Sequence, residues 1–459
     1  MDGGEGVSQK HRELLLIVLV CTAAAEFVVR GPLRLARHSD FNDFISPYVQ
    51  SRDWLQGMNP YDPQTLLRFW PVRNPETDFV AKEAADGTLV VRHGLPSPYP
   101  PPTFVILAPF ALLPWPVALL TWSGLTVAAF ALAVFCLASL GGLHRGSASR
   151  LCFVALALAF APVHSGLATG NPSILTLALG IVAIWLVQDG REAWGGILTG
   201  VALCLKPPVG LGFLLFLVVS RRWRAALAAV VCNTTVAVVA VVRMAWVHVE
   251  WFASYLELSR KMFSTQGVND PTAANAIRFS MVNLQVLLSS LGGERWIANA
   301  AALLITAVLG ILWLHFAVRR HRATSLLSLA LLLTLLLLPT YHRSYEAAAL
   351  LVSSGWILAA WHGQHRALAR VAFSLTLLFL LPGPVLLQNF VDTGLISRSM
   401  SQSWWWNTIA MPHQIWALCL LSLVMLYAMA STEEQLAGDS QERGIPSVQR
   451  RLDASCVSS

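Results

Sequence analysis

The chain has 459 residues, of which 55% are apolar and 12% are charged, and its mean hydropathy is +0.58. A soluble globular protein carries roughly 25% charged residues, so this composition excludes a water-soluble particle and indicates a membrane protein. The net charge of +7 does not indicate a nucleic-acid partner, because the basic residues lie in short clusters between apolar segments.

The apolar segments predict an all-α polytopic membrane protein with about twelve transmembrane helices, each of about 20 residues. The clear candidates are 13–31, 116–140, 151–168, 171–188, 224–247, 296–318, 323–340, 345–362, 368–388 and 411–430. The stretch 194–220 contains Lys206-Pro207-Pro208, where proline interrupts the helix. Two short crossings there, with the N-terminus inside, place the basic loops in the cytoplasm. Thr103–Leu113 is too short to span and is expected as a half-helix at the outer interface.

These spans predict a cytoplasmic N-terminus at 1–12, a membrane domain at 13–430 and a cytoplasmic tail at 431–459. The tail is poor in apolar residues and is expected to be disordered. Long outer loops follow at 37–102, 248–295 and 389–410. The first is rich in acidic residues and contains a predicted hairpin turn at Asp86-Gly87. Because ordered loops of this length are usually functional, we expect the site there.

Two carboxylates of the first outer loop are candidate bases, Asp40 and Asp43. An Asp held at the outer membrane face can deprotonate a hydroxyl that attacks an activated sugar carbon. The alternative is that either Asp caps a helix N-terminus. Further along this loop, Asn59-Pro60-Tyr61-Asp62-Pro63 is typical of a turn.

Polar residues at two predicted outer corners are candidate phosphate or sugar ligands. Lys206 lies at the helix break, where a cation is either a seat for a lipid phosphate or a side chain that snorkels to the interface. The corner Tyr341–Glu346 could bind phosphate or sugar hydroxyls, or could form a simple turn in which Glu346 pairs with Arg343.

Asn171, which follows Gly170, is a weaker candidate, because this corner is equally typical of a plain helix break. Three residues of the second outer loop are also weaker candidates, since they fit a solvated helix face as well. The latter are Arg278, Asn283 and Gln285. No Gly-rich phosphate loop or HExxH pattern is present, and no compact carboxylate cluster demands a metal. We therefore expect no resident cofactor and leave a divalent metal open. A donor that reaches the site through the membrane is favoured.

The motifs, taken in order, resemble glycosyltransferase family 87, the polyprenol-phosphate-sugar-dependent, mannosyltransferase-like proteins of the GT-C class. The matching segments are Asp43-Phe44 with Tyr48 and Leu55–Asp62, Tyr99-Pro100-Pro101 with Ala108–Pro114, Gly170-Asn171, Gly196–Pro207 with Arg221-Arg222, and Pro339–Tyr345. The resemblance runs over most of residues 13–430 and implies a GT-C-like helix bundle.

The resemblance implies a sugar transfer from polyprenyl phosphate to a lipid or glycan acceptor on the outer face of a bacterial plasma membrane. Mannose or a related hexose or pentose is the expected sugar. The resemblance also places the general base at Asp43, with Asp40 as the rival position. Combined with the corners above, it assigns the donor phosphate to Lys206, His342, Arg343 and Arg278. The substrate-binding candidates are Tyr48, Asn59, Tyr61, Asn171, Asn283, Gln285 and Tyr345. A secondary transporter and a non-catalytic envelope scaffold are the competing hypotheses.

Overall fold

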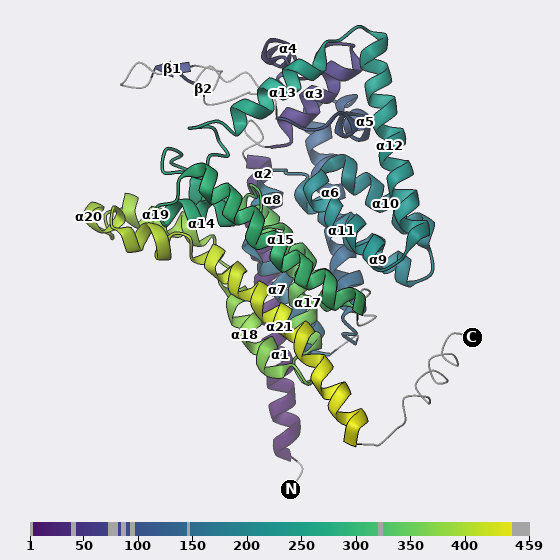
Figure 1. The fold of residues 1–459 in the computed structure, drawn as a ribbon, viewed down its shortest axis with the longest axis vertical. Coiled ribbons are helices and arrows are strands. Elements are labelled where there is room, and N and C mark those ends of the chain that lie inside the picture. The colour runs from purple at the N-terminus through teal and green to yellow at the C-terminus, as the bar shows by residue number, and fades with distance from the viewer. Residues whose placement is uncertain are drawn as a thin grey trace.

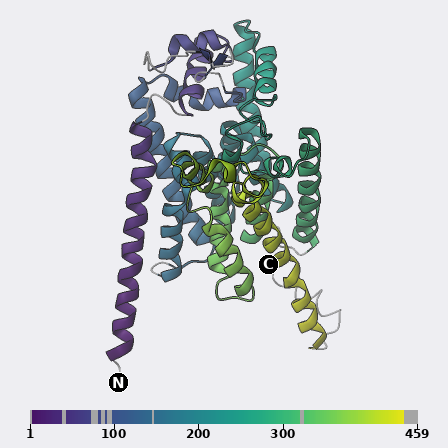
Figure 2. The same ribbon diagram turned by 90° about the vertical axis from the view of Figure 1, so that its left-hand side faces the viewer.

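A computed structural model describes residues 3–37, 43–71, 81–83, 89–91, 97–144, 147–319 and 325–442. Its helices form a bundle, with a smaller group of helices at the end opposite the N-terminus (Figures 1 and 2). The named secondary-structure elements are helices apart from one short hairpin, which confirms the predicted all-α class of polytopic membrane protein.

Five helical segments of the described chain are long and apolar enough to cross a membrane. They involve α1 (Gly3–Arg30) with α2 (Pro32–Arg37), α6 (Trp115–Leu140), α12 (Trp223–Trp246), α15 (Arg295–Arg319) and α21 (His413–Glu442). A sixth candidate is the pair α7 (Ala148–Ala159) and α8 (Ala161–Ala168), which is bent by 44°. Helix α21 continues past residue 430, where the tail was expected to begin, and 443–459 lie outside the described residues.

Shorter apolar helices complete the bundle. They are α9 (Ser173–Gln188), α10 (Glu192–Leu205), α11 (Pro207–Val219), α16 (Leu326–Leu336), α17 (Leu350–Ala359) and α18 (Arg366–Leu377). All six are shorter than the roughly 20 residues of a full span, so the total of twelve crossings stays a prediction.

The Lys-Pro-Pro sequence separates α10 from α11, as predicted. Lys206 has an extended backbone with φ −151° and ψ 90°, which suits the residue before a proline. A Cβ on Gly210 would lie 2.6 Å from the Leu203 amide nitrogen, so glycine allows the first turn of α11 to fold back against α10. Farther along α10, a Cβ on Gly200 would lie 2.8 Å from the Ala229 carbonyl, which shows how closely α10 packs on α12.

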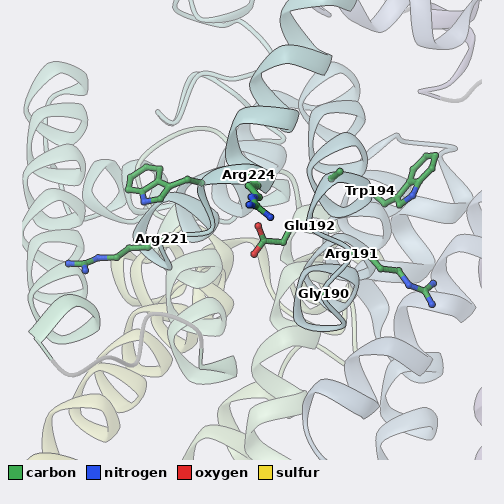
Figure 3. Close-up of a pocket in the computed structure, with 8 residues that line it drawn as sticks. Gly190, Arg191, Glu192, Trp194, Arg221 and Arg224 are labelled. Carbon is green, nitrogen blue, oxygen red and sulfur yellow. The ribbon is translucent and has the colours of Figure 1, made fainter. Parts of the chain in front are cut away.

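Helices α10 and α11 form a hairpin, and the end of the hairpin away from Lys206 carries basic residues. Arg222, just after α11, is paired with Glu192 at the start of α10 at 3.2 Å. Glu192 also lines a pocket of about 720 Å³ together with Arg191, Trp194, Arg221, Trp223 and Arg224, among others, and Arg224 and Glu192 face one another there (Figure 3). We call this the basic end. A single crossing over 194–220 would separate Glu192 from Arg222, so the contact confirms two helices running in opposite directions.

The first outer loop folds into a small unit at the other end of the bundle (Figure 2). It contains α3 (Ile45–Leu55), α4 (Pro63–Phe69), the strands β1 (Ala81–Glu83) and β2 (Leu89–Val91), and α5 (Pro101–Ala111). The strands pair antiparallel around the predicted turn, although Asp86 and Gly87 themselves lie outside the described residues. The unit docks on α12, where the Trp54 indole donates to the Ala240 carbonyl at 3.1 Å, and on the α10–α11 corner, where Thr103 donates to the Cys204 carbonyl at 2.7 Å.

The other two predicted outer loops and the 341–346 corner contribute further short helices. They contain α13 (Trp251–Met262), η1 (Arg278–Ser280), α14 (Leu284–Ser290), η2 (Ser344–Ala349), α19 (Gly383–Asp392), α20 (Arg398–Ser401) and η3 (Trp406–Ala410). A backbone bridge between Met281 and Arg343 ties the second outer loop to the 341–346 corner. The second predicted outer loop therefore meets this corner.

A buried carboxylate inside the first-loop unit accepts few hydrogen bonds. Asp53 is fully buried, and its Oδ1 has no hydrogen-bond partner, while Oδ2 accepts from Thr65 at 3.3 Å. Burial raises the pKa of Asp53 from its usual 3.8 to about 7, and the Thr65 hydrogen bond opposes this shift. The folded protein therefore binds a proton that the unfolded chain releases between these values.

We predict that reporters fused after Asp189 and after Arg222 report the same cytoplasmic side of the membrane. The physical reason is that both positions flank the ion pair at the basic end, and basic loops are retained in the cytoplasm. A reporter fused after Gly267, in the second outer loop, is the control and should report the opposite side. An outer location of the Arg222 fusion would contradict the hairpin topology.

Asp53 should make the protein less stable as the pH rises. The pKa of Asp53 is raised in the folded state. Its contribution to the free energy of unfolding is therefore largest below about pH 4, and it is lost as the pH rises through about 7. We expect the Tm of detergent-purified protein to fall between about pH 5 and about pH 8, and Asp53→Asn to flatten this slope and raise the Tm at the upper end. Asp392→Asn, at the exposed end of α19, is the matched control and should keep the slope of the native protein. An unchanged slope in Asp53→Asn would contradict the assignment.

Candidate active site

Asp43 is held at the entrance to α3 by the turn that precedes α9. Its amide donates to the Thr169 carbonyl at 2.6 Å, and its Oδ2 accepts from Asn171 Nδ2 at 2.8 Å. Gly170 has φ +65°, and a Cβ there would lie 3.1 Å from the Phe44 Cβ, so the turn favours glycine. The N-cap of α3 is Phe44 and no side chain caps it, so Asp43 is not a helix cap.

Lys206 lies behind Asn171 and is buried, with 8% of its surface exposed. Its ammonium donates to Asn171 Oδ1 at 3.1 Å and to Ser173 Oγ at 2.7 Å, and it forms an ion pair with Glu346. The Tyr345 ring lies 4.8 Å from Nζ and contributes a cation–π contact. The interfacial snorkelling alternative is therefore wrong for Lys206, because its charge is neutralised inside the protein.

Glu346 extends this network to His342. One carboxylate oxygen pairs with Lys206, and the other contacts His342 Nδ1, whose ring Nε2 lies 3.2 Å from the Thr340 hydroxyl. Glu346 does not pair with Arg343, which was the alternative for this corner. The result is one continuous polar chain that runs from Asp43 through Asn171, Lys206 and Glu346 to His342.

A cavity of about 460 Å³ adjoins Asp43. Arg30, Arg34, His164 and Ser344 line it together with Ser165, Thr169, Gln414 at the start of α21, and apolar residues of α8 and of the segment 381–385. Arg30 is paired with Glu26, whereas Arg34 has no ion pair within the described part of the chain. Asp43 thus borders a space that also holds positive charge, and the Lys206 ammonium does not line this cavity.

Two tyrosines border the network and remain protonated. Burial, followed by the nearby Asp43 carboxylate, raises the pKa of Tyr99 well above its usual value. Burial and the Glu346 carboxylate similarly raise the pKa of Tyr341. Neutral phenols can donate hydrogen bonds to oxygen atoms without adding negative charge next to Asp43.

Several predicted substrate residues instead support the first-loop unit. The Tyr48 ring is fully buried against Trp115, and its hydroxyl donates to the Leu113 carbonyl at 2.8 Å. Tyr61 is also buried and donates to the Tyr99 carbonyl at 2.6 Å. Asn59 accepts from the Tyr61 amide at 3.0 Å, which confirms the predicted turn, and Asp62 caps α4 through the Gln64 amide at 2.9 Å.

The second-loop residues do not join the Lys206 network. Asn283 caps α14 by accepting from the Val286 amide at 3.0 Å, and Gln285 donates to Asn299 of α15 at 2.8 Å. Arg278 donates to Asn407 at 3.1 Å, on the side of the third outer loop. Arg343 bonds Ser280 and the Val268 carbonyl, so it holds the loop to the corner. Asp40, the rival base, lies outside the described residues.

Four residues at the site were not among the predicted ones: Arg30, Arg34, Tyr99 and Ser173. The basic residues before the first outer loop were a visible signal, but they were assigned no role at the site. Tyr99 belongs to the Tyr-Pro-Pro motif, whose position along the chain does not reveal that it lies near Asp43. Ser173 has no distinguishing sequence signal, because a serine after a helix break is common.

This arrangement defines a polytopic membrane protein with a polar, carboxylate-containing site among its predicted outer loops. The model of glycosyltransferase family 87 matches residues 98–339, which is more than half of the chain. The chain therefore belongs to glycosyltransferase family 87, and the family resemblance noted in the motifs is confirmed.

Two curated relatives share part of this sequence. Both are described as an alpha-(1->3)-arabinofuranosyltransferase, from two strains of Mycobacterium tuberculosis, and each is 30% identical over 145 residues. The match covers 31% of this chain and 33% of each relative, so this chain spans only about a third of their length in the comparison. No solved structure matches the chain significantly.

We predict that Lys206 and Glu346 are energetically coupled. Removing one partner strands a buried charge and should cost about 3–5 kcal/mol of stability, whereas removing both should cost much less than the sum. Thermal unfolding of Lys206→Met, Glu346→Gln and the double variant in detergent measures this cycle. The control pair Arg222→Gln and Glu192→Gln is more exposed and should change stability by less than about 1 kcal/mol. Additive losses at Lys206 and Glu346 would contradict the coupling.

Proposed function

We propose that this protein is a membrane glycosyltransferase that moves a sugar from a polyprenyl-phosphate donor to a lipid or glycan acceptor. The observation that carries the proposal is the Asp43 carboxylate, which is oriented by Asn171 at 2.8 Å and borders a cavity containing Arg30 and Arg34. Membership of family 87 supports the reaction class.

Asp43 acts as the general base. Asn171 occupies one lone pair of Oδ2, which fixes the carboxylate and leaves other lone pairs free for an acceptor hydroxyl. As Asp43 takes the proton, the acceptor oxygen forms a bond to the anomeric carbon on the face opposite the leaving group. The bond from that carbon to the phosphate oxygen breaks, and its electron pair leaves with the phosphate. This single displacement inverts the configuration at the sugar carbon.

The network behind Asp43 positions this base. Lys206 shares its three N–H donors among Asn171, Ser173 and Glu346, so it orients Asn171 and has no donor left for a phosphate. The sequence predicted that Lys206 and His342 bind the donor phosphate. In this proposal they do not bind it. Arg34, with Arg30 beside it, supplies positive charge in the same cavity as Asp43 and stabilises the departing phosphate.

The sugar and the side of the membrane follow from separate arguments. The relatives' description names an arabinofuranosyl group, which supports a pentose alongside mannose as the transferred sugar. The basic residues around Glu192 and Arg222 favour a cytoplasmic basic end, which would place Asp43 at the outer face of a bacterial plasma membrane. A solute transporter is disfavoured by the family match.

Sugar transfer should depend on Asp43. We expect Asp43→Asn to lower the rate of transfer from radiolabelled polyprenyl-phosphate arabinose or mannose to membrane acceptors by about 10²–10⁴-fold, because the amide cannot take a proton. Product is measured by extraction and chromatography of the labelled glycolipid. Asp62→Asn lies in the same loop, away from the cavity, and should retain near-native activity. Full activity in Asp43→Asn, with equal folding, would refute the base assignment.

Arg34→Gln should weaken the donor interaction without unfolding the site. We expect a drop of at least about tenfold in kcat/KM for the lipid-linked donor, since a charge-assisted contact to phosphate is removed. Arg191→Gln, at the basic end, is the matched control and should leave kcat/KM unchanged. Donor kinetics that are identical in Arg34→Gln and the native protein would return the phosphate site to the 341–346 corner.

A further inference from the structure

A second polar cleft lies between the second and third outer loops, apart from the Asp43 cavity. It has a volume of about 430 Å³, and its lining includes Arg278, Ser290, Ser401, Ser403, Trp404 and Asn407. None of its lining residues is acidic. The cleft therefore combines hydroxyl, amide and guanidinium groups with one large aromatic ring.

The polar groups of this cleft are held in place by their neighbours. Arg278 stacks on the Phe279 ring at 4.3 Å and donates to Asn407 Oδ1 at 3.1 Å. Asn407 in turn donates to the Ser401 and Ser403 carbonyls at 2.9 and 3.1 Å. The Arg278 guanidinium carries five N–H donors, so this one bond leaves others available to a ligand.

Two features of the lining are unexplained by folding alone. The Ser290 hydroxyl is buried and has no hydrogen-bond partner, which costs free energy unless a ligand or water satisfies it. Trp404 is 64% exposed next to these polar groups. An indole face beside fixed hydroxyl, amide and guanidinium groups suits a sugar ring, which offers C–H groups on one face and hydroxyls around its edge.

The cleft is linked to the catalytic end through its own backbone. Ser280, two residues after Arg278, is bonded by Arg343, and the Val282 amide donates to the His342 carbonyl at 2.7 Å. Ser344, the residue after Arg343, lines the Asp43 cavity. Helix α19 contacts η1 and also contributes Val385 to that cavity. The two spaces are therefore connected through α19 and the 341–344 corner.

We propose that this cleft binds a neutral glycan portion of the acceptor while an acceptor hydroxyl is at Asp43. The proposal rests on the proposed function and specifies it: the acceptor carries sugar units beyond the one that reacts. Trp404 stacks on one such unit, Arg278 and Ser290 bond its hydroxyls, and Asn407 holds the Arg278 guanidinium in position.

The test measures glycan binding separately from sugar transfer. Native protein in lipid nanodiscs is titrated with neutral arabino- and manno-oligosaccharides, and binding is followed by saturation-transfer NMR. We expect at least one series to bind the native protein, and Trp404→Ala and Asn407→Ala to weaken that binding by about tenfold or more. Trp405→Ala, an exposed neighbour outside the lining, is the matched control and should bind like the native protein.

The outcomes separate this proposal from the proposed function. Asp43→Asn should lose transfer and keep oligosaccharide binding, which supports both. Binding that depends on Trp404 in a protein without transfer activity supports the cleft and refutes the function. Sugar transfer without oligosaccharide binding would refute the proposal that the cleft binds a glycan. Equal oligosaccharide binding by Trp404→Ala and the native protein would refute it as well. A Trp404→Ala protein with lower thermal stability but native glycan affinity would make Trp404 an interfacial anchor only and would also overturn the proposal.

Discussion

The buried ion pair between Lys206 and Glu346 is the interaction on which the site depends. Moving two charges out of water costs several kcal/mol per ion, and only close pairing with further hydrogen bonds offsets that cost. Here the ammonium is also bonded to Asn171 and Ser173, and the carboxylate is shared with His342. The pair therefore joins the α10–α11 corner, the start of α9 and η2 at a single point.

This network divides the charged residues of the site into two roles. Lys206 and Glu346 compensate one another, and Lys206 also bonds Asn171, whose amide holds Asp43. Arg34 borders the open cavity without an ion pair in the described chain, which is why the proposed function gives it the donor phosphate. Chemistry at a carboxylate needs both kinds: a rigid frame that fixes the base and a free positive charge for the leaving group.

The outer loops are more than connections between membrane helices. The first folds into a unit with its own buried aromatic residues and docks on α12, while the second and third enclose the cleft at Arg278 and Asn407. The Met281–Arg343 bridge ties the second loop to the 341–346 corner, and the first loop meets the second where Asn59 donates to Ser254 at 3.0 Å.

The sequence by itself determined the membrane class, the helix break at Lys206 and a short helix at about 103–113. It also placed Asp43, Asn171, Lys206, His342 and Tyr345 among the candidate residues. These follow from local rules, since apolar length and proline act on the chain where they occur. Only the tertiary structure decided that Lys206 is neutralised by Glu346, that Tyr48 and Tyr61 are core residues, and that Arg278 faces a different cleft. Pairings across more than a hundred residues, such as Asn171 with Asp43, depend on how the helices pack, and no local pattern encodes them.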